Sequence, residues 1–306
     1  MASFLLRRLE KHKSRRTGLA FAAVAISVLS WSSAFLVIAF SLKEMRPIPL
    51  ATARFAIAGL IALGWLLWRR PQLPSLRHMV RFAICGLFGF TLYSVFLNTG
   101  QTTVSVGAAS FIENVIPILT ALLAWMLLGE RFRLVGWLGF LVSFTGVSII
   151  AMNQPGDLTF GAGSTFILLA ALCSAVYFVM QKPLVLIYGA LPCTAYTMVF
   201  GALFLLPWSK DAVTEFMQAS PSTMIAVTGL AIFPTIIAYL AWNYALGELP
   251  AGVAANFIYL IAPFATLLAF IFFGDEPPMA TVVGGVMTML GTIIVARWGN
   301  ASSQKS

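Results

Sequence analysis

An acidic residue and a proline lie four positions apart inside a long apolar stretch. The stretch SFIENVIPILTALLAWMLLGE covers residues 110–130 and contains Glu113 and Pro117. Proline has no amide hydrogen to donate, so in a helix it leaves the carbonyl four positions earlier, here that of Glu113, without its partner. A carboxylate within a membrane costs about 2.5 to 3.5 kcal/mol on insertion scales, so Glu113 is expected to face the protein interior and to have a partner there. The pattern predicts a helix that breaks beside a buried acid.

The composition places these residues in a membrane. The chain has 306 residues, of which 60% are hydrophobic and 9% are charged, whereas an ordinary globular domain carries about 25% charged residues. Single cysteines within apolar runs indicate buried side chains, and neither a metal site nor a cofactor is expected. Runs of about 17 to 25 apolar residues are long enough to cross a bilayer. They predict an all-α integral membrane protein with ten transmembrane helices, at 18–40, 49–68, 79–99, 107–128, 135–152, 164–186, 192–207, 224–246, 251–273 and 281–298.

Lysine and arginine concentrate on one side of the expected bundle. If both termini lie on the same side, fifteen of the 19 basic residues fall on that side, three fall on the other, and Arg54 lies within a span. Such a bias predicts cytoplasmic termini, with residues 1–17 as a basic N-terminal segment and residues 299–306 as a C-terminal tail. Orientation in a lipid bilayer, expected to be the bacterial inner membrane, therefore explains the positive charge, and nucleic acid is not expected as a partner.

The two halves of the sequence are similar at an offset of about 143 to 146 positions. FLNTGQTTVSVGAASFIENVIPILTALLAWMLLGE aligns with AWNYALGELPAGVAANFIYLIAPFATLLAFIFFGDE, which pairs Pro117 with Pro263. Each half, 18–152 and 164–298, then holds five spans, and because five is odd the second repeat is expected to be inverted in the membrane. Inverted repeats with helices interrupted at corresponding positions are typical of secondary transporters that bind substrate between the halves.

The segments GAASFIENVIPILTALLAWMLLGE and GVAANFIYLIAPFATLLAFIFFGDE, in a five-plus-five arrangement, resemble the EamA-type drug/metabolite transporter superfamily. Over nearly its whole length the sequence resembles YddG-type bacterial aromatic amino-acid exporters in particular. The resemblance implies a ten-helix membrane fold and the export of a small molecule. It leaves the substrate open, because relatives carry amino acids, sugars, nucleotide sugars and drugs.

Polar residues near the two prolines are candidates for substrate binding. Pro263 frees the carbonyl of Tyr259, which is the repeat equivalent of Glu113. Asn114 follows Glu113 directly, and Asn256 lies in the repeat-related helix. A zwitterionic amino acid needs such polar partners in a membrane. The candidates for its polar head are Glu113, Asn114, Asn256 and Tyr259, with Pro117 and Pro263 as the helix breaks.

Glu113 has an alternative role as half of a structural ion pair. Arg54 lies within the second expected span, about 7 Å below the outer face, and the expected depth of Glu113 is about 9 Å. A direct pair between the two side chains would satisfy both charges without any substrate. The residues alone leave this structural role open beside the substrate-binding role.

Aromatic residues supply candidates for the apolar part of a pocket. Trp31 lies in the middle of its span, whereas the other seven tryptophans lie near span ends, as in an aromatic belt. Tyr177 lies at comparable depth in the repeat-related sixth span, and Tyr93 and Tyr239 lie deep in the third and eighth spans. The family resemblance places these four helices around the cavity. We therefore expect an aromatic-lined pocket for substrate formed by Trp31, Tyr93, Tyr177 and Tyr239.

Two other features are interpreted as structural. Lys182 precedes Pro183 at the end of the sixth span and is expected to extend its ammonium group to the membrane surface. Glycines recur at positions 139 and 146 and again at 284 and 291. They are expected to allow close helix packing, either within the scaffold or at a dimer face.

Other classes of protein fit the sequence less well. An enzyme needs a nucleophile with a base, or a metal cluster, and the chain has no HExxH or GxSxG motif and no deep histidine or aspartate. A channel is the alternative within the membrane class, although one deep carboxylate does not make a ring. The leading interpretation is a non-enzymatic secondary transporter that exports amino acids, aromatic or otherwise apolar, by alternating access, with other amphipathic metabolites or drugs as alternative substrates. Proton coupling and oligomeric state stay open.

Overall fold

A computed structural model describes residues 2–104, 106–152, 161–264, 267 and 278–299. The described residues are helical and contain no β-strand. In this part of the chain, eight helices are long and apolar enough to cross a membrane: Thr17–Ser41, Pro47–Arg69, Leu76–Gly100, Ala109–Leu128, Ala162–Tyr188, Ala190–Gln218, Pro221–Glu248 and Met279–Gly299. The expected spans 135–152 and 251–273 correspond to shorter apolar helices, Leu134–Ile150 and Ala251–Phe264. Most of 265–273, and the tail from residue 300, lie outside the described residues.

Several of these spans are built from more than one helical element. Segments η1, η3 and η5 are π-helical, and η2 and η4 are 3₁₀-helical. In chain order the elements are α1 (Ala2–Ser41), α2 (Pro47–Arg69), α3 (Leu76–Gly86), η1 (Leu87–Leu92), α4 (Tyr93–Gly100), α5 (Val106–Glu113), α6 (Ile116–Leu128), α7 (Leu134–Met152), α8 (Ala162–Tyr188), α9 (Ala190–Leu205), η2 (Leu206–Trp208), α10 (Ser209–Gln218), α11 (Pro221–Leu230), η3 (Ala231–Ile237), α12 (Ala238–Glu248), α13 (Ala251–Asn256), η4 (Phe257–Leu260), α15 (Met279–Ile294) and η5 (Val295–Gly299).

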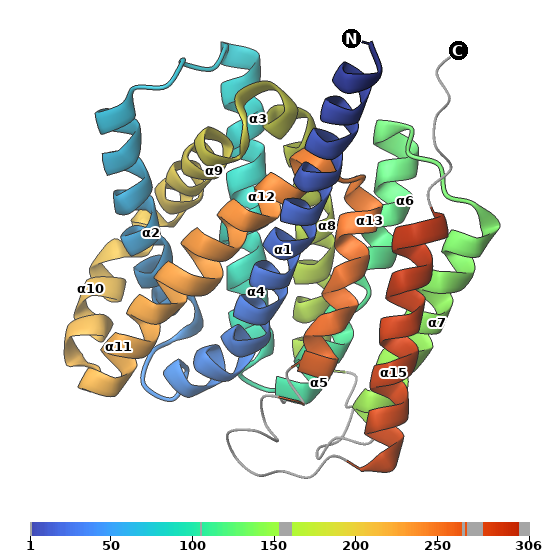
Figure 1. Cartoon of the computed structure of the whole chain (residues 1–306). Coiled ribbons are helices and arrows are strands. Elements are labelled where there is room, and N and C mark those ends of the chain that lie inside the picture. The colour runs from blue at the N-terminus through green and yellow to red at the C-terminus, as the bar shows by residue number, and fades with distance from the viewer. Residues whose placement is uncertain (1, 105, 153–160, 265–266, 268–277, 300–306) are drawn as a thin grey trace.

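The helices form one bundle in which both halves of the chain intermingle. Helices α2, α9 and α10 lie to the left in Figure 1, helices α6, α7 and α15 lie to the right, and α1, α4, α8 and α12 lie between them. The start of α1 and the end of α15 lie at the same end of the bundle, called here the termini end. The main core joins helices of both halves, with large buried side chains such as Phe55, Phe90, Tyr177 and Trp242.

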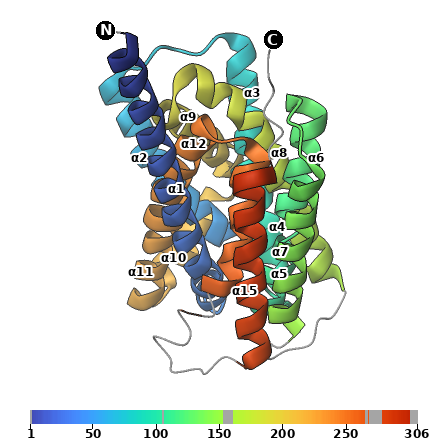
Figure 2. The same cartoon turned by 45° about the vertical axis from the view of Figure 1, so that its right-hand side comes forward.

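Helices α7 and α15 lie side by side, at the right of Figure 1 and turned forward in Figure 2, and glycines bring their backbones into contact. A Cβ atom on Gly146 would lie 2.5 Å from the carbonyl oxygen of Gly284, and one on Gly139 would lie 3.0 Å from that of Gly291. As the residue number increases along α7, from Gly139 to Gly146, the residue number of the α15 partner decreases, from Gly291 to Gly284. The two helices are therefore antiparallel. Among the described residues, the glycines expected to allow close packing therefore do so within the scaffold, between the two halves of the chain.

Gly146→Val is expected to destabilise the fold, because its side chain would occupy space now filled by the backbone of α15. Overpacking of this kind costs about 1 to 3 kcal/mol. The matched control is Gly64→Val in α2, where a Cβ would meet no atom within 4 Å. Thermal unfolding in detergent should show a lower Tm for the first variant only. Equal Tm values would contradict the close packing of α7 against α15.

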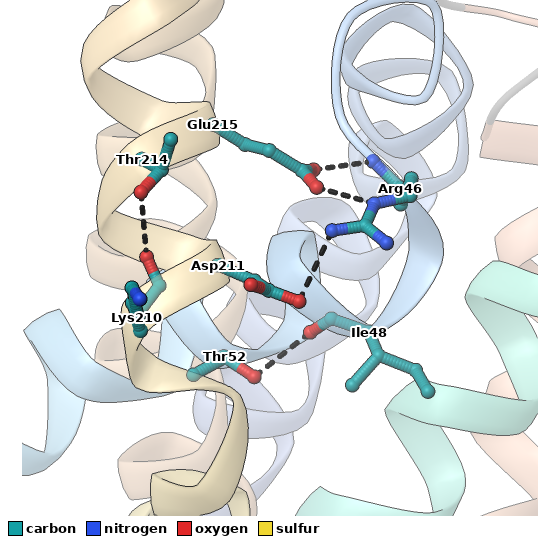
Figure 3. A network of polar contacts seen from close by, with 7 residues as sticks. All are labelled: Arg46, Ile48, Thr52, Lys210, Asp211, Thr214 and Glu215. Carbon is teal, nitrogen blue, oxygen red and sulfur yellow. Dashed lines mark hydrogen bonds and ion pairs between the residues drawn. The ribbon is translucent and has the colours of Figure 1, made fainter.

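At the end opposite the termini, a loop of the first half is fixed to α10 by ion pairs (Figure 3). The Arg46 guanidinium lies 2.5 Å from Glu215 through Nε and 3.1 Å from Asp211 through Nη2. The Arg46 amide also donates to Glu215 at 2.8 Å. Nearby, the amide and hydroxyl of Ser220 donate to Glu44 at 2.7 and 2.8 Å. These contacts join the α1–α2 loop to the α10–α11 connection.

The contact between Glu44 and Ser220 is expected to weaken in acid. Hydrogen bonds from the Ser220 amide and then its hydroxyl hold the pKa of the Glu44 carboxyl below its ordinary value of 4.5. Because the folded pKa is the lower one, the contact contributes to stability above pH 4.5 and is lost as pH falls through the folded pKa. The Tm difference between wild type and Glu44→Gln should therefore shrink from pH 7 toward pH 3. Glu248→Gln, at an exposed helix end, is the control. A Tm difference between wild type and Glu44→Gln that does not change with pH would contradict a stabilising contact of the Glu44 carboxylate with Ser220.

Candidate functional site

A small cavity lies between the two halves of the chain, near the middle of the bundle. Its volume is about 30 Å³, which is enough to hold a water molecule. Polar and aromatic side chains from α1, α2, α4, α5, α8 and α12 meet there, together with apolar side chains. The lining residues are Trp31, Ala34, Phe35, Ile38, Arg54, Tyr93, Leu97, Glu113, Ile116, Ser174, Phe178, Tyr239, Ile258 and Ile261.

Glu113 lies at an interruption between two helices. Helix α5 ends at Glu113 and α6 begins at Ile116, and between them Asn114 and Val115 form tight turns. The interruption is next to Pro117, whose missing amide leaves the Glu113 carbonyl without a helical donor. The Glu113 side chain is 4% exposed. Its Oε2 accepts a hydrogen bond of 3.3 Å from the Tyr93 hydroxyl, whereas its Oε1 is buried without a partner among the described residues.

The corresponding helix of the second half also departs from α-helical winding. Helix α13 ends at Asn256, and residues Phe257–Leu260 continue as the 3₁₀-helix η4, just before Pro263. Tyr259, the repeat equivalent of Glu113, is fully buried in a second apolar cluster with Phe140, Val147 and Ile150 of α7. Both halves therefore interrupt the same helix, but only the first half places an acid at the cavity.

Arg54 lines the cavity and does not pair with Glu113. Its side chain is 4% exposed, and its Nε donates to the Thr235 hydroxyl at 2.5 Å. In the described part of the chain, no Arg54 nitrogen lies within 4.0 Å of a carboxylate oxygen. The structural ion pair that the sequence left open is therefore not formed. Arg54 instead donates a hydrogen bond to Thr235 on η3, and Glu113 accepts one from Tyr93.

Two π-helical segments flank the cavity at repeat-related positions. Segment η1 directly precedes Tyr93, and segment η3 ends at Ile237, two residues before Tyr239. The wide winding presents carbonyl groups to side chains from other helices, as is common where π-helical turns occur at functional sites. The Tyr239 hydroxyl donates to the Gly89 carbonyl at 3.4 Å, and Trp31 Nε1 donates to the Pro234 carbonyl at 3.0 Å.

An aromatic cluster forms one wall of the cavity. The Trp31 ring stacks on Phe178 with centroids 6.3 Å apart and contacts Tyr239 edge-on at 5.3 Å. Trp242 packs behind them, 4.5 Å from Phe178 and 5.2 Å from Trp31, and is fully buried. The assignment of Trp242 to a belt at the membrane surface is therefore wrong. Helix α12 continues to Glu248, which carries Trp242 into the core.

Four of the predicted residues face other parts of the bundle. The Asn114 amide donates to the carbonyl of Ser110 on its own helix at 2.7 Å, and Asn256 donates to Thr292 on α15 at 3.2 Å. Tyr177 is fully buried and donates to Asn243 at 3.2 Å. None of these, nor Tyr259, is among the residues that line the cavity. Those brought together there are Trp31, Tyr93, Glu113 and Tyr239.

A partly buried charge cluster lies at the termini end. Gly129, with φ +68°, ends α6 in a left-handed turn and directs Glu130 toward α13. The Glu130 carboxylate accepts from the amides of Ala251 and Gly252 at 2.7 and 3.1 Å. Lys182 Nζ lies 3.4 Å from this carboxylate and also donates to the Leu249 carbonyl. The expectation that Lys182 extends to the membrane surface is therefore wrong, because an acid is within reach inside the bundle.

Comparison with known proteins agrees with this architecture. The family model of the EamA-like transporter family matches residues 18–152 and again residues 161–297. A probable terminal-alkyne amino-acid exporter of Streptantibioticus cattleyicolor is 31% identical over 278 residues, which are 90% of this chain and 92% of that protein. The uncharacterised transporter YdfC of Bacillus subtilis is 32% identical over 262 residues, 85% of each chain.

A solved crystal structure has the same fold. It matches with a TM-score of 0.72 at 20% identity, covering 92% of this chain and 96% of its own. The two family matches show that the chain contains two related repeats, and the apolar helices show a multi-pass membrane protein. One of the two named relatives is described as an exporter and the other as a transporter. The chain therefore belongs to the EamA-like transporter family.

Proposed function

We propose that this protein is a secondary transporter that exports amino acids, aromatic or otherwise apolar, by alternating access. The observation that carries the proposal is the central cavity, where one carboxylate, one guanidinium and an aromatic wall meet between the halves. This combination suits a ligand with a charged head and an apolar body. The relative named as a probable terminal-alkyne amino-acid exporter supports the same class of substrate.

The proposed architecture is ten membrane helices in two inverted repeats, 18–152 and 164–298. The two shorter apolar helices, Leu134–Ile150 and Ala251–Phe264, would complete the ten. The antiparallel contact of α7 with its repeat equivalent α15 supports inversion, because equivalent helices of inverted halves run in opposite directions. The charge bias supports cytoplasmic termini in a bacterial inner membrane, with the termini end of the bundle facing the cytoplasm.

The cavity is small for an amino acid, which supports a transport cycle with a constricted state. Ligand pockets for drug-sized molecules hold about 300 to 1,000 Å³, against about 30 Å³ here. The site must therefore widen to admit substrate. The ion pairs of Arg46 at one end and the Glu130 cluster at the other join the two halves of the chain. We propose that these clusters close the two ends alternately.

Counterflow in liposomes tests the proposed function. Purified protein is reconstituted with an unlabelled amino acid inside, and radiolabelled amino acid is added outside. A transporter accumulates label transiently, whereas a channel equilibrates it without overshoot. A panel of the twenty amino acids, with and without a pH gradient, identifies the substrate and shows whether protons take part. Absence of counterflow for every amino acid would contradict the proposal.

A further inference from the structure

We propose that Arg54 binds the carboxylate of the substrate and that Arg54 and Glu113 together recognise the zwitterionic backbone of a free α-amino acid. This inference rests on the proposed function and makes it more specific. It assigns the two charged groups of one substrate to two side chains, and it gives Arg54 a binding role instead of the structural one that the sequence suggested.

The first step is that Arg54 is held with most of its donors unused. Guanidinium has five N–H groups. Among the described residues, Arg54 makes one hydrogen bond, from Nε to Thr235. Thr235 in turn donates to the Leu230 carbonyl at 2.8 Å, so the anchor is fixed on η3. The remaining N–H groups of a side chain that lines the cavity form a fork that matches a carboxylate in two parallel hydrogen bonds.

The second step is that Glu113 offers the opposite charge on the same cavity. Its Oε1 is buried and has no partner in the described part of the chain. Ten other buried polar atoms of the described residues also lack a partner, but Glu113 Oε1 is the only carboxylate oxygen among them, and an unpaired charged group costs more than a neutral one. Arg54 does not supply the partner, although both side chains line the cavity. An α-amino acid carries an ammonium group for Glu113 and a carboxylate for Arg54, and so satisfies both.

The third step is that the fold itself does not require either charge. In the repeat alignment Arg54 corresponds to Thr197, and Glu113 corresponds to Tyr259. Thr197 is fully buried and donates to the Cys193 carbonyl at 2.7 Å, and Tyr259 packs against α7. The same helical positions are thus filled by neutral side chains in the second half. Two charges that each cost several kcal/mol in a membrane are retained in the first half, where they meet at the cavity.

The fourth step orients the rest of the substrate. Trp31, Phe178 and Tyr239 line the same cavity and pack against one another. With the backbone of the amino acid between Arg54 and Glu113, its side chain meets this aromatic wall. Recognition is then strongest for an apolar or aromatic amino acid with both backbone charges free, and weak for an amide, an amine or an N-blocked derivative.

Three related ligands test the inference on the purified full-length protein. L-Phenylalanine has both charges, L-phenylalaninamide lacks the carboxylate, and 3-phenylpropionate lacks the ammonium group. Binding is measured by calorimetry and by the ligand-induced rise in Tm. Wild type should bind L-phenylalanine at least about 10-fold more tightly than either analogue, because a hydrogen bond to a charged group contributes about 1.5 to 3 kcal/mol and 1.4 kcal/mol is tenfold.

The variants separate a binding role from a structural one. Arg54→Gln should weaken L-phenylalanine about 10- to 100-fold and leave L-phenylalaninamide unchanged, with Arg54→Lys intermediate. Arg70→Gln, at an exposed helix end, should behave as wild type. The inference is overturned if wild type does not bind L-phenylalanine or binds the amide equally well, or if Arg54→Gln weakens both ligands by the same factor. If Arg54→Gln does not fold, the affinities of the wild type and of Arg54→Lys for the three ligands test the inference in its place.

Transport assays distinguish failure of this inference from failure of the proposed function. Selective binding of L-phenylalanine without counterflow would contradict the transport proposal and leave the role of Arg54 in place. Transport would be supported, and the role of Arg54 contradicted, if L-phenylalanine shows counterflow but Arg54→Gln does not change the ratio of the affinities for L-phenylalaninamide and L-phenylalanine.

Discussion

Glu113→Gln is expected to leave the protein folded and to reduce amino-acid transport by about 10- to 100-fold, since a hydrogen bond to a charged group contributes about 1.5 to 3 kcal/mol. Glutamine has nearly the same shape as glutamate and still accepts the hydrogen bond that Tyr93 donates at 3.3 Å. The change does not leave Arg54 without a partner, because Arg54 is anchored on Thr235. The change removes only the negative charge that we propose faces the substrate ammonium group.

The measurement combines counterflow with thermal unfolding in detergent, and Glu248→Gln is the control for the loss of one carboxylate at an exposed position. The double variant with Arg54→Gln distinguishes the two roles that the sequence left open. A structural pair predicts that the single variant loses stability and that the double variant regains it. A substrate role predicts an unchanged Tm and no rescue of transport.

If Glu113 also relays protons, wild-type transport should depend on pH and that of the variant should not. A stable and fully active Glu113→Gln protein would contradict both accounts.

The sequence predicted the general architecture because membrane helices leave a strong signal. A run of about 20 apolar residues needs no tertiary contact to be identified. The repeat showed where the two interrupted helices lie, and α5 does end at Glu113. The division of spans into α-, π- and 3₁₀-helical segments was not predicted. These changes in winding depend on which side chains satisfy the freed carbonyls, such as Trp31 at Pro234, and those partners come from distant parts of the chain.

The site was predicted less completely, because helical direction was not resolved at the interruptions. Asn114 follows the last residue of α5 in a tight turn, and its side-chain amide donates back to the Ser110 carbonyl. Neighbouring residues on an α-helix point about 100° apart, so on α8 Phe178 lines the cavity although the sequence favoured Tyr177, whose hydroxyl is directed to Asn243. Tyr259 shares its repeat position with Glu113. It lies in η4, where 3₁₀ winding of three residues per turn changes the direction of successive side chains.

The Glu130 cluster was not predicted, because its members are distant in sequence and Lys182 was assigned to the membrane surface. Glu130 follows the fourth span and Lys182 lies in the last turns of the sixth, and nothing in either segment specifies the other. Their contact arises from the packing of α6, α8 and the start of α13 at the termini end. A carboxylate at the N-terminus of α13 is also favoured by the free amides and the positive end of the helix dipole there.

Glu130→Ala is expected to lower the free energy of unfolding by about 3 kcal/mol. Removal of one partner from a buried ion pair costs about 3 to 5 kcal/mol, because the remaining charge is left unpaired in a poorly solvated site. The lower value applies because the Lys182 and Glu130 side chains are 16% and 11% exposed. The loss of the carboxylate also frees the amides of Ala251 and Gly252, which adds to the cost.

A double-mutant cycle with Lys182→Met measures the pair itself. Lys182→Met alone should cost less than Glu130→Ala, because Glu130 keeps its two amide donors. The double variant should be more stable than Glu130→Ala alone, since it no longer contains an unpaired lysine among the packed helices. Thermal unfolding in detergent gives the four stabilities, and Glu248→Ala serves as the control at an exposed position. If the two costs simply add, the 3.4 Å contact between Lys182 and Glu130 contributes nothing to stability, and the cost of Glu130→Ala comes from its lost hydrogen bonds to the Ala251 and Gly252 amides.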